Sequence, residues 1–361
     1  MSSTGRRRVV VVVRGLDPVG SGRQAELAAG ALRSAGHDVV LAVTTGGGSV
    51  PARLARAGFP VHRLARRPRP GLEAAAALAR LARRGDARTF LAFGRGQAAV
   101  AVAARCLVPR AAVVAAVELP PRGAAGLLAA RADRLVVPDQ TAAAAWRHGG
   151  VDAARIDLVP PGIEPVAGSG ASRGDVAARL GLRPGTVWTL CVAPLDPCAQ
   201  LDRLLWAVDQ LGVVHRGLEH VLVGAGHGPG AGRRRARLQR LAERLFVHAS
   251  IDCLPDLLPR VRLVWQAGEV AGGGCLLDGM AHGVAAIAVD SGAARRLIDD
   301  GVTGRLVAAD PVSELPRRAL AIIEDDALAA RYGSAARERV AREFPLSGFA
   351  AGIVAAVGRL E

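Results

Sequence analysis

Residues 265–307 read WQAGEVAGGGCLLDGMAHGVAAIAVDSGAARRLIDDGVTGRLV. A glycine-rich run, Ala271–Gly274, leads into a short helical segment and then into the apolar run Ala286–Val289. A short apolar run is typical of a parallel strand that is buried on both faces. A glycine-rich loop that opens a helix leaves backbone N–H groups unpaired at the positive end of the helix dipole. The stretch therefore predicts a loop–helix–strand unit with an anion site, although a plain loop-to-helix connection has the same pattern.

A similar unit opens the chain. Val9–Val13 has a buried-strand pattern, and Gly15–Gln24 is a glycine-rich loop. Ala25–Gly36 has a helical pattern, and His37–Thr45 is again strand-like. These segments form a βαβ unit with parallel strands. A dinucleotide site is the competing interpretation, but GSGRQA lacks a third glycine in register and no acidic residue ends the second strand.

Strand-like and helical segments alternate along the rest of the chain. This alternation predicts two doubly wound α/β domains with ligands at the carboxyl ends of their strands. The 361 residues are enough for two such domains. The small-residue run Val166–Gly174 is typical of a linker. We expect one domain over residues 1–165 and a second over residues 175–345.

Three motifs in the second half resemble one enzyme family. They are GMAHG at Gly279–Gly283 with the AIAVDSG that follows, DGVTGRLV at Asp300–Val307, and HVLVGAGHGPG at His220–Gly230. They are similar to donor-domain motifs of retaining GT-B glycosyltransferases of the "group 1", or family 4, type. The resemblance implies two Rossmann-like domains facing a cleft, with residues 346–361 as a helix that crosses back to the first domain. It also implies retaining transfer of a sugar from a nucleotide-sugar donor to an unknown acceptor, without a metal or other cofactor.

The resemblance also implies which residues form the site. The second carboxylate of the family's glutamate pair falls on Asp278, and the first falls on Val270, with Glu269 one residue early. Asp278 and Glu269 are therefore the candidate catalytic residues. The candidate donor-binding residues are Gly20, Gly22, Gly224, Gly226, Gly272, Gly273, Gly274, Cys275 and Leu276.

Several charged positions of the family are altered here. The phosphate-binding Arg falls on Pro194 and the Lys on Ala199, while a family Glu falls on Arg296. No His stands near Phe93, where the family has one. Charge-assisted hydrogen bonds contribute about 1.5–3 kcal/mol each, so their joint loss without a substitute would abolish efficient transfer. Arg203 is a nearby candidate substitute. The alternative is a catalytically inactive homologue that keeps the fold for binding or assembly.

The formal charge of +15 raises a third hypothesis, a basic surface that binds polyanions. The sequence contains no Lys, so its 47 Lys or Arg residues are all Arg, and they are spread along the chain. Aromatic residues make up only 3%, too few for base-stacking platforms. The composition therefore does not favour a nucleic-acid partner, and it leaves peripheral membrane contact open.

Cysteine usage and hydropathy indicate the compartment. The five cysteines are odd in number and form no C-x-x-C pair, so neither a disulfide framework nor a zinc site is indicated. No apolar run reaches membrane-span length, and the five valines near the N-terminus are too short for a signal-peptide core. These features predict a protein of the cytoplasm.

Overall fold

The structure, a computed structural model, describes residues 7–44, 50–65, 71–193, 195, 199–224, 244–268 and 273–360. Contacts within the chain divide it into two compact units. Unit 1 consists of Met1–Gly162 and Leu346–Glu361, and unit 2 is Ile163–Pro345. The last helix is therefore part of unit 1, while the small-residue run after Gly162 is part of unit 2.

Unit 1 is built on a seven-stranded parallel sheet with the order β3-β2-β1-β4-β5-β6-β7. The strands are β1 (Arg8–Val13), β2 (Asp38–Val43), β3 (Val61–Arg63), β4 (Thr89–Phe93), β5 (Ala112–Ala116), β6 (Arg134–Val137) and β7 (Ile156–Leu158). All five valines of β1 are fully buried. Helices cover both faces of a parallel sheet, which is why an uninterrupted apolar run predicts such a strand.

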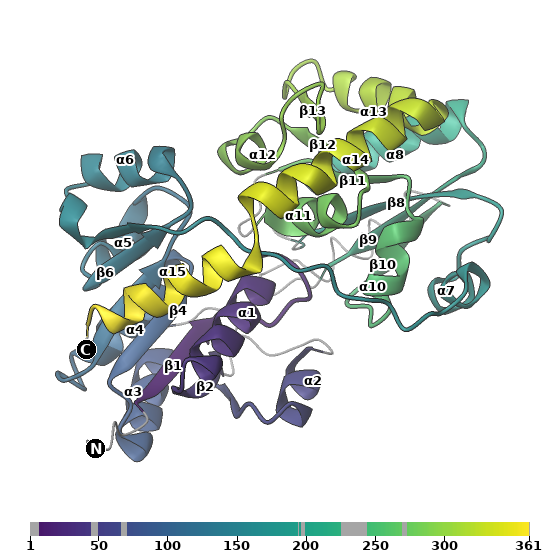
Figure 1. The fold of residues 1–361 in the computed structure, drawn as a ribbon. Coiled ribbons are helices and arrows are strands. Elements are labelled where there is room, and N and C mark those ends of the chain that lie inside the picture. Colours follow the sequence, from purple (N-terminus) through teal and green to yellow (C-terminus); the bar gives the residue numbers. More distant parts are fainter. Residues whose placement is uncertain are drawn as a thin grey trace. The chain divides into compact units, whose positions relative to one another are not determined.

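Helices on the two faces of this sheet create two apolar cores. They are α1 (Gly20–Ser34), α2 (Val50–Arg56), α3 (Leu72–Gly85), α4 (Arg95–Arg105), α5 (Gly123–Ala129), α6 (Gln140–His148) and α15 (Leu346–Gly358). One core joins α3, α4 and α6 to Val10 and Val12 of β1, and the other joins α1 and α15 to Val9 and Val11. Helices α1 and α15 lie side by side (Figure 1). The end of the chain thus completes the core of unit 1.

Unit 2 is built on a six-stranded parallel sheet with the order β10-β9-β8-β11-β12-β13. The strands are β8 (Val187–Val192), β9 (Leu218–Val223), β10 (Leu245–His248), β11 (Leu263–Gln266), β12 (Ala285–Val289) and β13 (Gly304–Val307). The helical segments are α7 (Arg173–Leu180), α8 (Leu201–Val214), α10 (Leu254–Leu257), the 3-10 turn η3 (Leu258–Arg260), α11 (Gly274–Ala281), α12 (Gly292–Leu297), α13 (Glu314–Glu324) and α14 (Asp326–Glu343).

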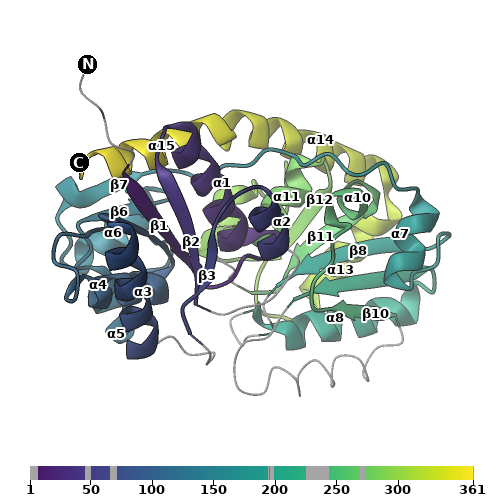
Figure 2. The ribbon, with the colours of Figure 1, turned by 90° about the horizontal axis from the view of Figure 1, so that it is seen from below.

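The helices of unit 2 also cover both faces of their sheet. Residues of α8 and α13 share one core with Cys191 and Trp265. Helix α11 packs on the other face, where a Cβ on Gly279 would meet the Val264 side chain at 2.6 Å. Figure 2 shows α8 and α11 on opposite sides of the unit-2 strands. The prediction of two doubly wound parallel-sheet domains is confirmed.

Gly22 supplies a test of the packing in unit 1. A Cβ on Gly22 would lie 2.4 Å from the Asp17 nitrogen and 2.7 Å from its carbonyl oxygen, and neither backbone atom can rotate away. Gly22→Ala is therefore expected to lower the free energy of unfolding by about 1–3 kcal/mol, measured by urea denaturation. The control is Gly30→Ala on the same helix, where a Cβ meets nothing within 4 Å. It should raise stability by up to about 1 kcal/mol, since alanine is the better helix former. Equal effects of the two substitutions would contradict the close approach.

Candidate functional site

The carboxyl ends of β8 and β11 mark a switch point at one edge of the unit-2 sheet. These strands are parallel neighbours. The chain leaves β8 for α8 on one face of the sheet, and it leaves β11 for α11 on the other face. Loops that diverge in this way leave a crevice between them, and open α/β sheets bind their ligands at that place.

Gly224 lets two loops come together at this edge. It follows β9, and a Cβ on it would lie 1.9 Å from the carbonyl oxygen of Ala193, which follows β8. The Gly224 N–H donates to the His248 carbonyl at 2.8 Å. Any side chain at Gly224 would push the loops apart, so the glycine is required by the backbone packing.

The N-terminus of α11 is formed by two glycines with left-handed backbone. Gly273 is the N-cap residue with φ +74°, and Gly274 has φ +53°. Among the described residues, no side chain caps this helix and no acidic side chain lies in its first turn. The first backbone N–H groups of α11 therefore remain available to an anion at the positive end of the helix.

Cys275 and Leu276 turn their side chains into the interior. Both are fully buried, and the Cys275 Sγ accepts a hydrogen bond from the Val192 N–H at 3.3 Å. Burial raises the pKa of the Cys275 thiol to about 12, so the thiol stays protonated at neutral pH. These two candidate residues can therefore offer a ligand their backbone N–H groups and not their side chains.

Asp278 lies one turn further along α11. Asp278 is only 7% exposed, and its negative charge is one of the causes that raise the pKa of the Cys275 thiol. Its carbonyl accepts from the His282 ring Nδ1 at 2.8 Å. Glu269, Gly226 and Gly272, the remaining candidates of this half, lie outside the described residues.

Gly20 and Gly22 lie at the start of α1 in unit 1. Gly20 has φ +63°, and no described side chain caps the helix. The same helix is anchored by Gln24, whose amide exchanges two hydrogen bonds with the Gly162 backbone, at 2.8 and 3.0 Å. The two glycines thus form a second uncapped helix N-terminus, at the carboxyl end of β1.

The candidate substitute cation is held by neighbouring groups. Arg203 donates through Nε to the Gln200 side chain at 2.7 Å and through a second nitrogen to the Ala309 carbonyl. Of the positions that replace the family's cations, Ala199 is buried and Pro194 lies outside the described residues. The described contacts therefore tie Arg203 to the loop after β13.

Arg295 is a cation at this edge that sequence reasoning missed. It forms a two-pronged ion pair with Asp290, at 2.5 and 2.6 Å, and its side chain is 69% exposed. The hydrogen bond from Arg295 lowers the pKa of Asp290, and the Asp290 carboxylate raises the pKa of Arg295. Helix α12 also touches the α11 N-terminus, because a Cβ on Gly273 would lie 2.8 Å from the Leu297 side chain. The sequence signal for this pair was Asp290, directly after the predicted strand Ala286–Val289, with Arg295 and Arg296 a few residues later.

Gln266 is a second residue that sequence reasoning missed. It ends β11, is 2% exposed and donates its amide N–H to the Gly268 carbonyl at 2.8 Å. Its side-chain oxygen has no hydrogen-bond partner in the described part of the chain. Buried amide oxygens are usually paired, so an unused acceptor remains at this edge.

Comparison with known proteins identifies the family. The family model described as Glycosyltransferase Family 4 matches residues 19–166, and the model described as Glycosyl transferases group 1 matches residues 187–325. The chain belongs to the family 4, group 1 glycosyltransferases. The solved structure of Anabaena Alr3699/HepE in complex with UDP and glucose is similar over 98% of this chain and 100% of its own, with TM-score 0.78 and 18% identity. The structure of WaaG, a glycosyltransferase involved in lipopolysaccharide biosynthesis, is similar over 97% of this chain and 100% of its own, with TM-score 0.73 and 15% identity.

Curated relatives match only part of this chain. The D-inositol 3-phosphate glycosyltransferase of Nocardia farcinica is 30% identical over 169 residues, which is 44% of this chain and 37% of the relative. The phosphatidyl-myo-inositol mannosyltransferase of Mycolicibacterium smegmatis is 37% identical over 94 residues, which is 26% of this chain and 22% of the relative. The chain thus spans less than half the length of the curated relatives it matches.

Neither a metal-binding cluster nor a membrane-spanning helix occurs among the described residues. No group of three or more His, Cys, Asp or Glu side chains there could hold a metal ion. Within the same residues, every helix is too short or too polar to cross a membrane.

The buried thiols give a testable consequence. Cys106 is exposed, whereas Cys191, Cys253 and Cys275 are buried and burial raises the pKa of each. Because the thiolate is the reactive form, iodoacetamide at pH 8 is expected to label Cys106 well before these three. Peptide mass spectrometry of the folded and the urea-unfolded protein measures the order. Early labelling of Cys275 in the folded protein would contradict its inward orientation.

Proposed function

We propose that this protein transfers a glycosyl unit from a nucleotide-sugar, with the donor diphosphate held at the N-terminus of α11. The observation that carries the proposal is the uncapped pair Gly273–Gly274 at the switch-point edge of unit 2. As the bond to the sugar breaks, the diphosphate gains negative charge. Backbone N–H groups already aimed at that position stabilise the charge without rearranging.

Side chains around α11 supply the remaining contacts in this proposal. Arg295 lies on the helix that packs against Gly273, and its exposed pair with Asp290 contributes little stability, so the guanidinium can exchange Asp290 for a phosphate. Asp278 and Glu269 accept hydrogen bonds from donor hydroxyl groups. The glycines, Cys275 and Leu276 contribute backbone. With Arg295 and the N–H groups providing positive charge, the donor needs no metal ion.

The donor and the acceptor are proposed from the proteins that this chain resembles. Structures similar to this chain hold UDP or UDP-glucose, so a uridine diphosphate sugar is the first donor to test. Several relatives are named for inositol-phosphate acceptors, which makes a phosphorylated cyclitol the first acceptor. We also propose that transfer retains the anomeric configuration and that the protein is cytoplasmic.

A non-catalytic homologue is the second candidate function. It is favoured by the buried Ala199 at a cation position of the family and by the bonds that hold Arg203. Such a protein would keep the fold as a scaffold for binding, without turning over a donor.

Donor binding separates these two functions. A ligand that binds only the folded state raises its stability, so saturating UDP-glucose should raise the melting temperature. Arg295→Ala should reduce this shift through the loss of a charge-assisted contact with the diphosphate. The control is Arg317→Ala, which removes an exposed arginine paired with Glu314 on α13. A flat response to UDP-, GDP- and ADP-sugars would reject the transferase and leave the scaffold.

Asp278 is tested by transfer itself. Asp278→Asn should lower kcat/KM at least about 100-fold if the carboxylate binds the donor, since two lost contacts of about 1.4 kcal/mol each amount to that factor. Asp278→Glu, which restores the family's residue, should retain activity. Asp209→Asn, an exposed substitution on α8, is the matched control. An unchanged rate in folded Asp278→Asn removes Asp278 from the site, and NMR of the product anomer reports retention.

A further inference from the structure

A cavity lies in unit 2, at the edge opposite the α11 N-terminus. Its volume is about 320 Å³, and it is lined by the first residues of β8 and β12, by the segment before β11 and by the start of α14. The α11 edge is at the other end of β8, which runs from Val187 to Val192. At ~3.3 Å per residue the two edges are separated by roughly 17–20 Å. The cavity is therefore distinct from the proposed donor site.

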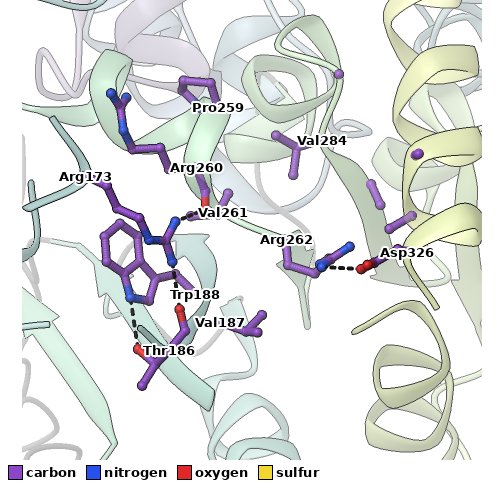
Figure 3. Close-up of a pocket in the computed structure, with 14 residues that line it drawn as sticks. Arg173, Thr186, Val187, Trp188, Pro259, Arg260, Val261, Arg262, Val284 and Asp326 are labelled. Carbon is purple, nitrogen blue, oxygen red and sulfur yellow. Dashed lines mark hydrogen bonds and ion pairs between the residues drawn. The ribbon is translucent and has the colours of Figure 1, made fainter. Parts of the chain in front are cut away.

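Arg173 forms one wall of this cavity. Its guanidinium lies over the Trp188 ring, 3.7 Å from the ring centre (Figure 3). Its hydrogen bonds within the described chain all go to backbone carbonyls, those of Pro184 and Thr186 at 2.7 Å and that of Arg260 at 3.2 Å. These three bonds use three of the five guanidinium N–H groups and do not cancel the charge. Burial and the nearby charge of Arg260 lower the pKa of Arg173, as expected for like charges held together.

Arg262 forms the opposite wall and faces Asp326, the one acidic residue of the described lining. It is paired with Asp326 at 2.5 Å, and the Asp326 side chain is 86% exposed (Figure 3). Arg260, at the rim, donates to the carbonyls of Asp256 and Ala171. The described lining thus includes three arginines and one aspartate.

Neighbouring carboxylates do not neutralise the arginines that line the cavity. Glu219 accepts from Arg183 and Thr186, and Asp256 accepts from Ser169. Asp325 caps the N-terminus of α14 by accepting from the Leu328 N–H, so this carboxylate already has a partner. The cavity therefore has a surplus of positive charge that comes from its arginines alone.

We propose that this cavity binds a small phosphate-bearing anion between Arg173 and Arg262, with the anion displacing Asp326 from Arg262. A doubly charged phosphate competes well with a single exposed carboxylate, and planar guanidinium groups match its oxygens. The volume lies at the lower end of the range for small-molecule sites, and Val284, Ala329 and Ala330 give it an apolar side. A phosphate group with a small organic part fits these features. The inference does not depend on transferase activity.

The test is titration calorimetry of the full chain with orthophosphate and with a hexose monophosphate, at ionic strength held constant with chloride. Arg262→Gln should raise Kd at least about tenfold, the effect of losing one charge-assisted contact. Asp326→Asn should lower Kd, because it removes the competing carboxylate. A merely structural ion pair predicts no such opposite effects. Arg317→Gln removes a charge elsewhere in unit 2 and should leave Kd unchanged.

Binding by the folded wild type that Arg262→Gln leaves unaltered would overturn the proposal, as would weaker binding by Asp326→Asn. No binding of either anion at millimolar concentration would overturn it as well. Melting temperatures of the variants establish that they fold. Equal affinity for the two anions assigns the site to the phosphate group alone, and tighter hexose phosphate binding assigns it to phosphate esters. Both of these outcomes support the site.

Discussion

Unit 2 depends on the burial of β8 between two parallel neighbours. β8 pairs with β9 on one side and β11 on the other, and Trp188 and Leu190 within it are fully buried. Helices must therefore cover both faces of the sheet, and the connections from β8 and β11 must leave on opposite faces. That single constraint opens the crevice at the carboxyl ends and places the α11 N-terminus beside it.

Burial on both faces also decides which polar groups the sheet can contain. Burial holds the pKa of His220 at about 3, so the imidazole is neutral, and it pairs with the Thr189 hydroxyl at 2.7 Å. Burial alone would raise the pKa of Glu219, but hydrogen bonds from Thr186 and Arg183 outweigh it and the pKa lies below its ordinary value. At the amino edge Glu219 is thus held by side-chain hydrogen bonds, whereas the described part of the carboxyl edge combines the backbone N–H groups of α11 with the Arg295–Asp290 pair. The two edges suit anions by different chemistry.

The sequence predicted the parts of this structure that depend on local pattern. The valines of β1 and the run within β12 read correctly as buried strands, because such strands are apolar without alternation. The orientation of Cys275 could not be predicted, since all eight residues of α11 are buried and the helix has no polar face to fix its rotation. The contact of Arg203 with Ala309 and the meeting of Arg173 with Arg260 join residues about 90–110 positions apart, which no local pattern encodes.

The retained glycines are weak evidence for activity, because the fold itself requires them. Gly224 has no room for a Cβ, and Gly273 adopts a left-handed backbone against Leu297. A protein that had lost its chemistry would keep both for packing alone. Asp278 is different, since burying a carboxylate in α11 costs free energy that an apolar side chain would not. Backbone packing does not require Asp278 as it requires the glycines, so substituting Asp278 tests a donor at this edge more sharply than substituting a glycine.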